Sequence, residues 1–172
     1  NLLRSGVCLL ALLALTLPGL GAQEYIYGRQ VKKLRLPDLP GYVTVAGDFH
    51  MHTVYSDGSV LPDVRVNEIY REGLGALATT DHAEFSPYLS DLPKNSNRSN
   101  ELAAKRAGEL GLIHIPGTEI TRDFSQGEFS GHFVALFIKN VDAVEVPDTF
   151  DMLREAKRQG AFLFWCHPPA VW

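Results

Sequence analysis

Short apolar runs alternate along the chain with segments whose apolar residues recur at helical spacing. Apolar runs of strand length, bounded by turn residues, occur at residues 43–50, 74–80, 112–118, 133–138 and 161–166. Amphipathic segments with helical periodicity occur at residues 62–72, 101–110 and 149–158. The polar stretch 90–100 is predicted to be a loop. With an apolar content of 45%, this alternation predicts one α/β domain over residues 43–172.

The connection between the third and fourth predicted strands is too short for a parallel crossover. Only twelve residues, rich in serine, glycine and charge, separate Glu119 from His132. A parallel crossover needs about that many residues for its helix alone. We therefore predict that residues 133–138 return antiparallel to the preceding strand. His132 would then enter at the end of the sheet where Glu119 leaves it, and the two side chains could share a metal ion.

The segment from Gly47 to Gly58 carries two histidines one residue apart and a carboxylate five residues later. Side chains at positions i and i+2 of a strand point to the same face, so His50 and His52 would present both imidazoles to one point. Asp57 follows in a turn-rich stretch, where Gly58 lets the backbone fold back and aim the carboxylate toward the strand end. Taken alone, this pattern fits a metal site and a pair of polar strand-end residues equally well.

Polar residues at the ends of the other predicted strands change this balance. These strands end in Asp81-His82, in Glu119 and in His167-Pro168. Polar side chains at the carboxyl ends of parallel strands converge, and α/β enzymes place their chemistry there. The convergence favours a metal site over separate structural histidines.

His114 is the exception among the six histidines. Counting in twos back from Glu119 places Gly117, Ile115 and Ile113 on the face of that carboxylate. His114 therefore lies on the opposite face of the strand, and we interpret it as a structural histidine.

In their order along the chain, these motifs resemble those of the PHP superfamily, named for bacterial polymerases and histidinol phosphatase. The resemblance covers about residues 44 to 170. It rests on His50-x-His52 with Asp57, Thr80-Asp81-His82, Gly117-Thr118-Glu119, His132 and Cys166-His167-Pro168. The most similar type within the family is the stand-alone phosphoesterases that act on nucleotides and related small phosphates. The resemblance implies a distorted seven-stranded (β/α) TIM-like barrel that uses up to three divalent metal ions to hydrolyse a small phosphate ester.

The resemblance also implies which residues bind metal. The implied ligands are His50, His52, Asp57, His82, Glu119, His132 and His167. Glu119 would bridge a first ion, held by the His-x-His pair, to a second ion held by the last two histidines, while Asp57 and His82 would hold a third. Imidazole and carboxylate ligands suit zinc, manganese and iron, so two or three such ions are the expected cofactors. Glu119, His82 and Asp57 are the residues expected to act directly in catalysis.

Three further residues near these motifs receive separate interpretations. Asp81 is expected to fix a neighbouring ligand, because metal-bound imidazoles usually donate their other N–H to an acceptor. Arg122, just beyond the strand that ends in Glu119, could clamp a substrate phosphate, although a surface arginine in a polar loop fits equally well. Cys166 is interpreted as a packed apolar residue.

Residues 1–22 have the pattern of a secretory signal peptide. Arg4 precedes a stretch of eleven residues, Val7 to Leu17, that is apolar apart from Thr16, and a zone of small residues follows. Eleven residues are too few to span a bilayer core of ~30 Å, so no stable membrane insertion is expected after cleavage. Residues 23–42 are predicted to be an extended lead-in. The expected location is secreted or periplasmic, in a bacterium.

Net charge bears on nucleic-acid binding, and the C-terminal sequence bears on whether the domain is complete. A net charge of −4 gives no surface suited to nucleic acid. The family's last motif, an Asp-x-His pair, should come well after His167-Pro168, and none lies between Pro168 and Trp172, so we expect an incomplete domain without the last strands of the barrel.

Two alternatives to a phosphoesterase stay open at this point. One is a metal-dependent amidohydrolase acting on C–N bonds, since His-x-His on a first barrel strand is shared by that chemistry. The other is a non-catalytic metal-binding barrel in which the cluster is residual.

Overall fold

The computed structural model describes residues 25–26, 28–88, 90–92, 95–121 and 131–167. The predicted signal peptide and Arg122 lie outside these residues. Within the described part, no helix is both long enough and apolar enough to cross a membrane.

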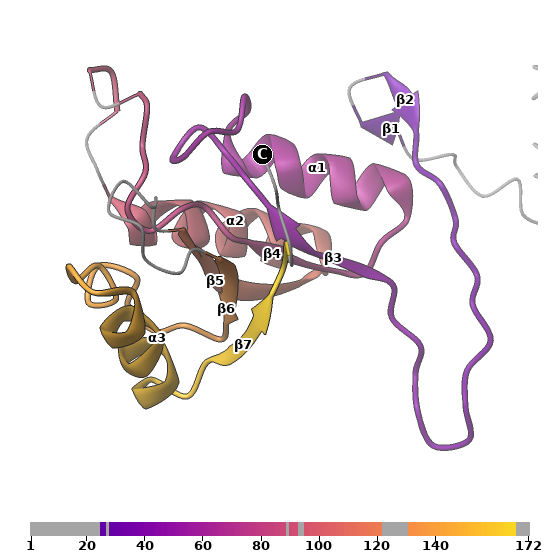
Figure 1. Ribbon diagram of the computed structural model, residues 1–172. Helices are drawn as coiled ribbons and strands as arrows, with labels where there is room; N and C mark the ends of the chain where they lie inside the picture. Colours follow the sequence, from indigo (N-terminus) through magenta and orange to yellow (C-terminus); the bar gives the residue numbers. More distant parts are fainter. Residues whose placement is uncertain (1–24, 27, 89, 93–94, 122–130, 168–172) are drawn as a thin grey trace, which may run out of the picture.

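A five-stranded sheet forms the centre of the described part, and its strands lie side by side in the order in which they occur along the chain (Figure 1). They are β3 (Gly47–Met51), β4 (Ala76–Thr79), β5 (Ile113–Thr121), β6 (His132–Leu136) and β7 (Phe162–Trp165). Strands β3, β4 and β5 are parallel, whereas β6 runs antiparallel to both β5 and β7. The antiparallel return after Glu119 is therefore confirmed, and the fold is a mixed α/β half-barrel.

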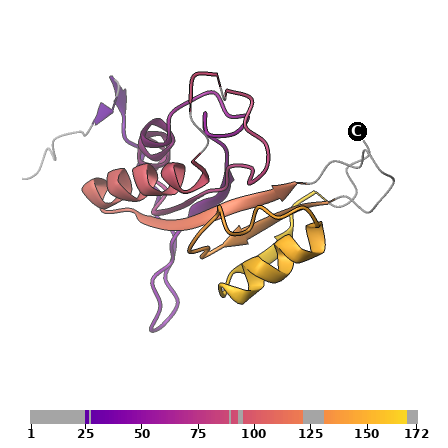
Figure 2. The same cartoon turned by 90° about the vertical axis from the view of Figure 1, so that its left-hand side faces the viewer.

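Three helices pack against the outer face of this curled sheet. They are α1 (Pro62–Glu72), α2 (Ser96–Leu110) and α3 (Thr149–Arg158). Leu77 of β4 packs with α1 and α2, and Ile120 of β5 packs with α3. The β4–β5 register and the alternation of side chains place both residues on the sheet face opposite Glu119. Because the sheet curls, its outer face turns through a wide angle from β3 to β7. The helices on that one face therefore lie on two sides of the strands in Figure 2, with α1 and α2 on one side and α3 on the other.

The opposite, inner face of the sheet carries an apolar layer beneath the candidate site. Ala78, Val134 and Leu136 are buried in it, and Phe164 and Cys166 pack against them. Glu119 is paired across the β5–β6 ladder with Val134, which in turn is paired with Phe164. The buried carboxylate therefore stands at the edge of an apolar surface.

The boundaries of α1 and α3 agree with the prediction, but α2 begins five residues earlier than expected. The Asn95 side chain caps α2 by accepting a hydrogen bond from the backbone N–H of Arg98. The polar stretch that was predicted to be a loop thus contains the first turn of the helix. Exposed polar residues and a capped start both suit a helix whose other face packs on the sheet.

Asn100 of α2 holds β5 in place just before Glu119. Its side-chain amide donates to the Gly117 carbonyl over 2.9 Å and accepts from the Gly117 N–H over 3.0 Å. A Cβ at position 117 would lie 2.9 Å from Thr80 Cγ2 and 3.0 Å from the Thr79 carbonyl oxygen, so only glycine fits. Close packing at Gly117 therefore fixes the strand two residues before the buried carboxylate.

The predicted lead-in contains one short hairpin. Residues Tyr25–Ile26 (β1) and Arg29–Gln30 (β2) form a short antiparallel hairpin around Gly28, whose φ of 70° favours glycine. Lys32 then forms an ion pair with Glu72 at the end of α1. The first predicted strand also starts later than expected, at Gly47.

Candidate metal centre

Five histidines gather at one edge of the half-barrel and form a closed ring of imidazoles. Successive ring centroids lie 4.6–5.9 Å apart. In order around the ring they are His50 on β3, His52 just after β3, His82 after β4, His132 at the start of β6 and His167 after β7. The structure thus brings together every histidine that the sequence motifs singled out.

Glu119 lies at the centre of this ring, with a side chain that is only 1% exposed. Its Oε2 lies 2.9 Å from Nε2 of both His50 and His52. Its Oε1 lies 2.7 Å from His132 Nδ1 and 3.8 Å from His167 Nε2. The two carboxylate oxygens therefore face two different pairs of imidazoles.

Asp57 occupies the rim of the cluster, with half of its side chain exposed. Its Oδ1 lies 3.1 Å from His52 Nδ1, and its Oδ2 lies 3.5 Å from His82 Nε2. The other ring nitrogen of His82 forms a hydrogen bond with Thr121 Oγ1 at 2.8 Å. Thr121 thus fixes the His82 ring so that Nε2 points toward Asp57.

Two groups of side chains within the cluster have the spacing of metal ligands. His50, Glu119, Cys166 and His167 form one group, and His52, Asp57 and His82 form the other. Within each group, one ligand atom from every member lies within 4.8 Å of the rest. Asp57 and His82 are in the same group, as the resemblance implies. His52, which was expected to share an ion with His50, is in the group of Asp57 and His82 and also lies next to Glu119.

Burial and charge act in opposite directions on the ionisable groups of the cluster. Burial disfavours the Glu119 carboxylate, but hydrogen bonds from His50 and His52 and the nearby imidazole charges outweigh it and hold the pKa well below its usual value. Burial lowers the pKa of His52, but Glu119 and Asp57 outweigh it, and the net change is upward. For His82 and His167 burial is the larger effect, and each pKa is lowered.

Asp81 supports the cluster, although it does so through a loop and not through an imidazole. Its Oδ1 accepts from the Thr53 N–H at 2.6 Å and from the Ser56 hydroxyl at 2.7 Å, and its Oδ2 accepts from the Thr53 hydroxyl at 2.7 Å. Ser56 Oγ in turn lies 3.2 Å from His52 Nδ1 and 3.4 Å from Asp57 Oδ1. Asp81 was expected to fix a neighbouring ligand. In the structure its hydrogen bonds go to Thr53 and Ser56, and Ser56 connects it to His52 and Asp57.

Gly58 shapes the same loop, but for a different reason than predicted. A Cβ at this position would lie 2.5 Å from the carbonyl carbon and oxygen of His52. The Gly58 N–H also donates to the Thr53 carbonyl at 2.9 Å. Close backbone approach, and not an unusual φ, is therefore what requires glycine here.

Two further residues contact the cluster although the sequence did not predict them to bind metal. Arg65 of α1 donates to the His52 carbonyl at 2.9 Å and pairs with Glu68. Cys166 donates through its sulfur to the His132 carbonyl at 2.9 Å. Burial, with the charge of Glu119, raises the pKa of the Cys166 thiol to about 12. The position of Cys166 directly before His167 was the one available sequence signal.

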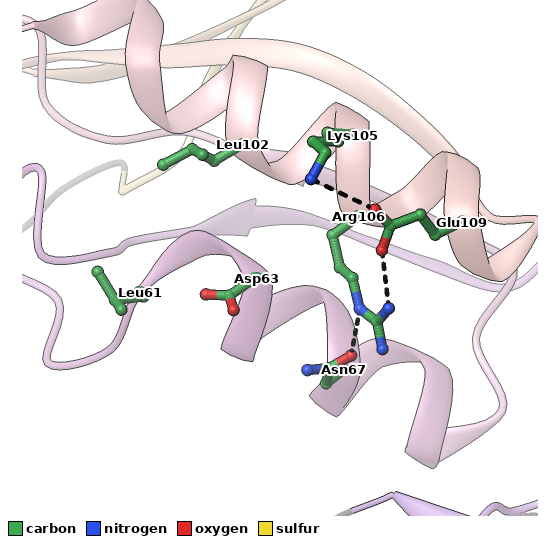
Figure 3. A pocket seen from close by; sticks show the side chains of 7 residues that line it. All are labelled: Leu61, Asp63, Asn67, Leu102, Lys105, Arg106 and Glu109. Atoms are coloured by element: carbon green, nitrogen blue, oxygen red, sulfur yellow. Dashed lines mark hydrogen bonds and ion pairs between the residues drawn. The ribbon is translucent and has the colours of Figure 1, made fainter.

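Two cavities lie near α1. One of about 540 Å³ borders the cluster and is lined in part by His50, His52 and Arg65. The other, of about 690 Å³, lies in the groove between α1 and α2 (Figure 3). In that groove Arg106 contacts Asn67 and Glu109, so its charge is already compensated. Of these two cavities, only the first borders imidazoles of the cluster, through His50 and His52.

His114 lies away from the ring, on the outer face, as strand parity predicts. Its Nε2 is hydrogen bonded with Thr79 Oγ1 at 3.1 Å, and burial lowers its pKa to about 4. Because the unfolded pKa is about 6.5, the unfolded chain binds a proton at His114 that the folded chain does not, between about pH 6.5 and pH 4. Stability from this residue is thus present above pH 6.5 and lost as the pH falls.

We expect His114→Asn to be less stable than the parent chain at pH 7, by about 1 kcal/mol for the lost hydrogen bond. The difference should shrink at pH 5, because only the parent chain has the buried imidazole. Urea unfolding of the metal-free proteins at both pH values measures this. Metal content should be unchanged, and a variant that folds normally but loses an ion would contradict the placement of His114.

Comparison with known proteins places this geometry in a family. No family model matches the chain. A crystal structure of a two-domain protein from Bacteroides vulgatus, described as containing a predicted PHP-like metal-dependent phosphoesterase, is 45% identical to the chain with a TM-score of 0.75. The match covers 83% of this chain and 40% of that one. The chain belongs to the PHP superfamily.

Two other comparisons cover shorter parts of the chain. A putative metal-dependent phosphoesterase from Bifidobacterium adolescentis is 29% identical over 53% of this chain and 27% of that one, with a TM-score of 0.41. An uncharacterized protein of Methanocaldococcus jannaschii is 39% identical over 74 residues, which are 43% of this chain and 33% of that protein. The PHP chain described here thus spans less than half the length of each of these proteins.

Proposed function

We propose that this chain is a metal-dependent hydrolase that cleaves phosphate esters with a centre of two or three divalent ions. The observation that carries the proposal is the position of Glu119. A fully buried carboxylate whose two oxygens face two separate imidazole pairs is suited to bridge two ions. Its ionised state in a buried site also calls for positive charge around it.

The donor set fits such ions. Imidazole and carboxylate ligands in a mixed cluster suit zinc, manganese and iron. When bound, two neighbouring ions polarise a phosphoryl oxygen and lower the pKa of a water molecule that attacks phosphorus. The chain's own residues hold the ligands in position for this step.

The candidate ligands differ in how far they are exposed to solvent. Glu119 and His82 form the floor, with side chains 1% and 8% exposed, whereas Asp57 and His167 form the rim, at 50% and 40%. A substrate phosphate therefore has access from the side of Asp57 and His167. The Asp81–Ser56 hydrogen bond holds the rim loop, and Thr121 holds the His82 ring. Arg122, proposed as a phosphate clamp, follows Thr121 directly in the sequence.

The proposal is tested on the protein purified at full length from its source. Metal content is measured first, and phosphate monoesters and diesters are then screened before and after chelation. We expect turnover that chelator abolishes and that added zinc, manganese or iron restores. Cleavage of amides without cleavage of phosphate esters would instead support the amidohydrolase alternative. Bound metal without turnover on either class would support a non-catalytic barrel.

The predicted signal peptide leads to a second proposal, that the protein is exported from the cytoplasm of a bacterium. The support is the charged, apolar and small-residue pattern of residues 1–22. Fractionation of cells with an antibody against the chain tests it. Accumulation of the uncleaved chain in the cytoplasm would contradict it.

A further inference from the structure

Cys166 lies inside one of the two groups of candidate metal ligands, on the side of Glu119 that presents Oε1. Its sulfur is 3.4 Å from that oxygen, and it follows β7 directly. The ligand atoms of His50, Glu119, Cys166 and His167 all lie within 4.8 Å of one another. The sulfur therefore has the spacing of a metal ligand, as the two histidines of the group do.

The surroundings of this thiol differ on its two sides. Ala78, Val134 and Leu136 pack from the inner face of the sheet and keep the sulfur at the edge of the cluster. On the other side, the sulfur faces the His132 carbonyl at 2.9 Å and the Glu119 carboxylate at 3.4 Å. A thiol has one proton and can donate to only one of these oxygens. The His132 carbonyl also accepts the Cys166 backbone N–H at 2.9 Å, so it keeps a donor when the thiol loses its proton. A cation could then be bound by the sulfur and the Glu119 carboxylate together.

We propose that Cys166 is a metal ligand and that the group of His50, Glu119, Cys166 and His167 binds a thiophilic divalent ion such as zinc. This inference rests on the proposed function, since it assumes that the Glu119 centre binds metal. Thiolate ligands select zinc over magnesium, calcium and manganese. The thiol proton passes to solvent as the metal–sulfur bond forms.

The two halves of the centre then differ in chemistry. The group of His52, Asp57 and His82 offers only nitrogen and oxygen ligands, which also suit manganese or iron. The group that contains Cys166 adds a soft ligand. A chain with both groups would retain zinc in one position while the other position exchanges its ion according to supply.

Cobalt substitution of the full-length chain tests the proposal, because a cobalt–thiolate bond gives a sulfur-to-metal charge-transfer band in the near ultraviolet. The parent chain should show this band when it is saturated with Co²⁺. Cys166→Ala and Cys166→Ser should both abolish it and weaken zinc binding by roughly tenfold or more. Cys8, the one other cysteine of the sequence, lies in the predicted signal peptide, so Cys8→Ala in the uncleaved chain is the matched control and should keep the band.

Zinc X-ray absorption gives a second readout that does not depend on a variant. A zinc–sulfur distance of ~2.3 Å, separate from zinc–nitrogen distances of ~2.0–2.1 Å, is expected for the parent chain. Absence of both the charge-transfer band and the sulfur distance in metal-saturated protein would overturn the proposal. Persistence of the band in Cys166→Ala that retains the parent circular dichroism spectrum would overturn it as well.

The outcomes also separate this inference from the proposed function. Phosphate ester hydrolysis by a protein without the cobalt–sulfur band would keep the function and remove Cys166 from the ligands. A cobalt–sulfur band in a protein that hydrolyses no phosphate ester would keep the ligand and overturn the function.

Discussion

Glu119→Gln is expected to abolish metal-dependent hydrolysis and to lower the bound metal by more than one equivalent. The amide keeps the shape of the side chain but offers one oxygen in place of two, and it carries no charge. One of the two imidazole pairs would therefore lose its carboxylate partner. Because even outer residues of metal sites change affinity 10–100-fold, we expect hydrolysis to fall at least roughly a hundredfold. Elemental analysis and phosphate ester assays on the same preparations measure both effects.

The same chemical change at Glu101→Gln is the control for this variant. Glu101 lies on the exposed face of α2, where it pairs with Arg98. Surface pairs of this kind contribute little, so metal content and turnover should equal those of the parent chain. Full activity in Glu119→Gln would show that the bridging role is wrong, whereas equal losses in both variants would indicate a general effect of the lost charge.

Asp81→Ala is expected to destabilise the fold and to weaken metal binding at the rim. The change leaves the buried Thr53 N–H without its acceptor and removes the shortest hydrogen bond of the buried Thr53 and Ser56 hydroxyls, which keep only contacts of 3.2–3.4 Å. We expect a loss of roughly 3 kcal/mol in the free energy of unfolding, since each buried unsatisfied donor costs about 1–3 kcal/mol. Metal affinity should fall roughly 10–100-fold, because Ser56 is the link to His52 and Asp57.

Asp81→Asn separates hydrogen bonding from charge at the same position. The amide keeps one oxygen for the Thr53 N–H and the Ser56 hydroxyl, and its NH₂ can donate to the Thr53 hydroxyl. The loss of stability should therefore be smaller than for the alanine variant. Chemical denaturation of the metal-free variants, followed by zinc titration, measures both quantities. Equal effects of the two substitutions would show that the carboxylate charge, and not the hydrogen bonds, supports the loop.

Two features of the candidate site could be predicted from the sequence, because they depend only on neighbouring residues: the face of each strand on which a side chain lies, and the direction of the strand that begins at His132. The alternation of side chains in strands put His50, Glu119 and His114 on the correct faces. The short connection before His132 correctly required an antiparallel strand. These inferences needed only the period of a strand and the length of a crossover.

The remaining contacts could not be read from the sequence because they join distant segments. Thr121 meets His82 only because an isolated bridge pairs the end of β4 with β5. Asp81 reaches Thr53 and Ser56 because the loop after β3 folds across the end of β4. The register between β3 and β4 also shifts between Asp48 and Met51, so that His52 reaches the cluster from beyond the strand end. Such contacts depend on how the loops pack.

The pairing of Thr121 with His132 closes the β5–β6 ladder at the edge of the cluster. The ladder holds Glu119 and His132 in place, and His132 Nδ1 also lies 2.7 Å from Glu119 Oε1. The two strand ends that residues 122–130 join are therefore fixed by strand pairing. A protein engineer who replaces residues 122–130 with another sequence would leave the pairing that positions Glu119 and His132 in place.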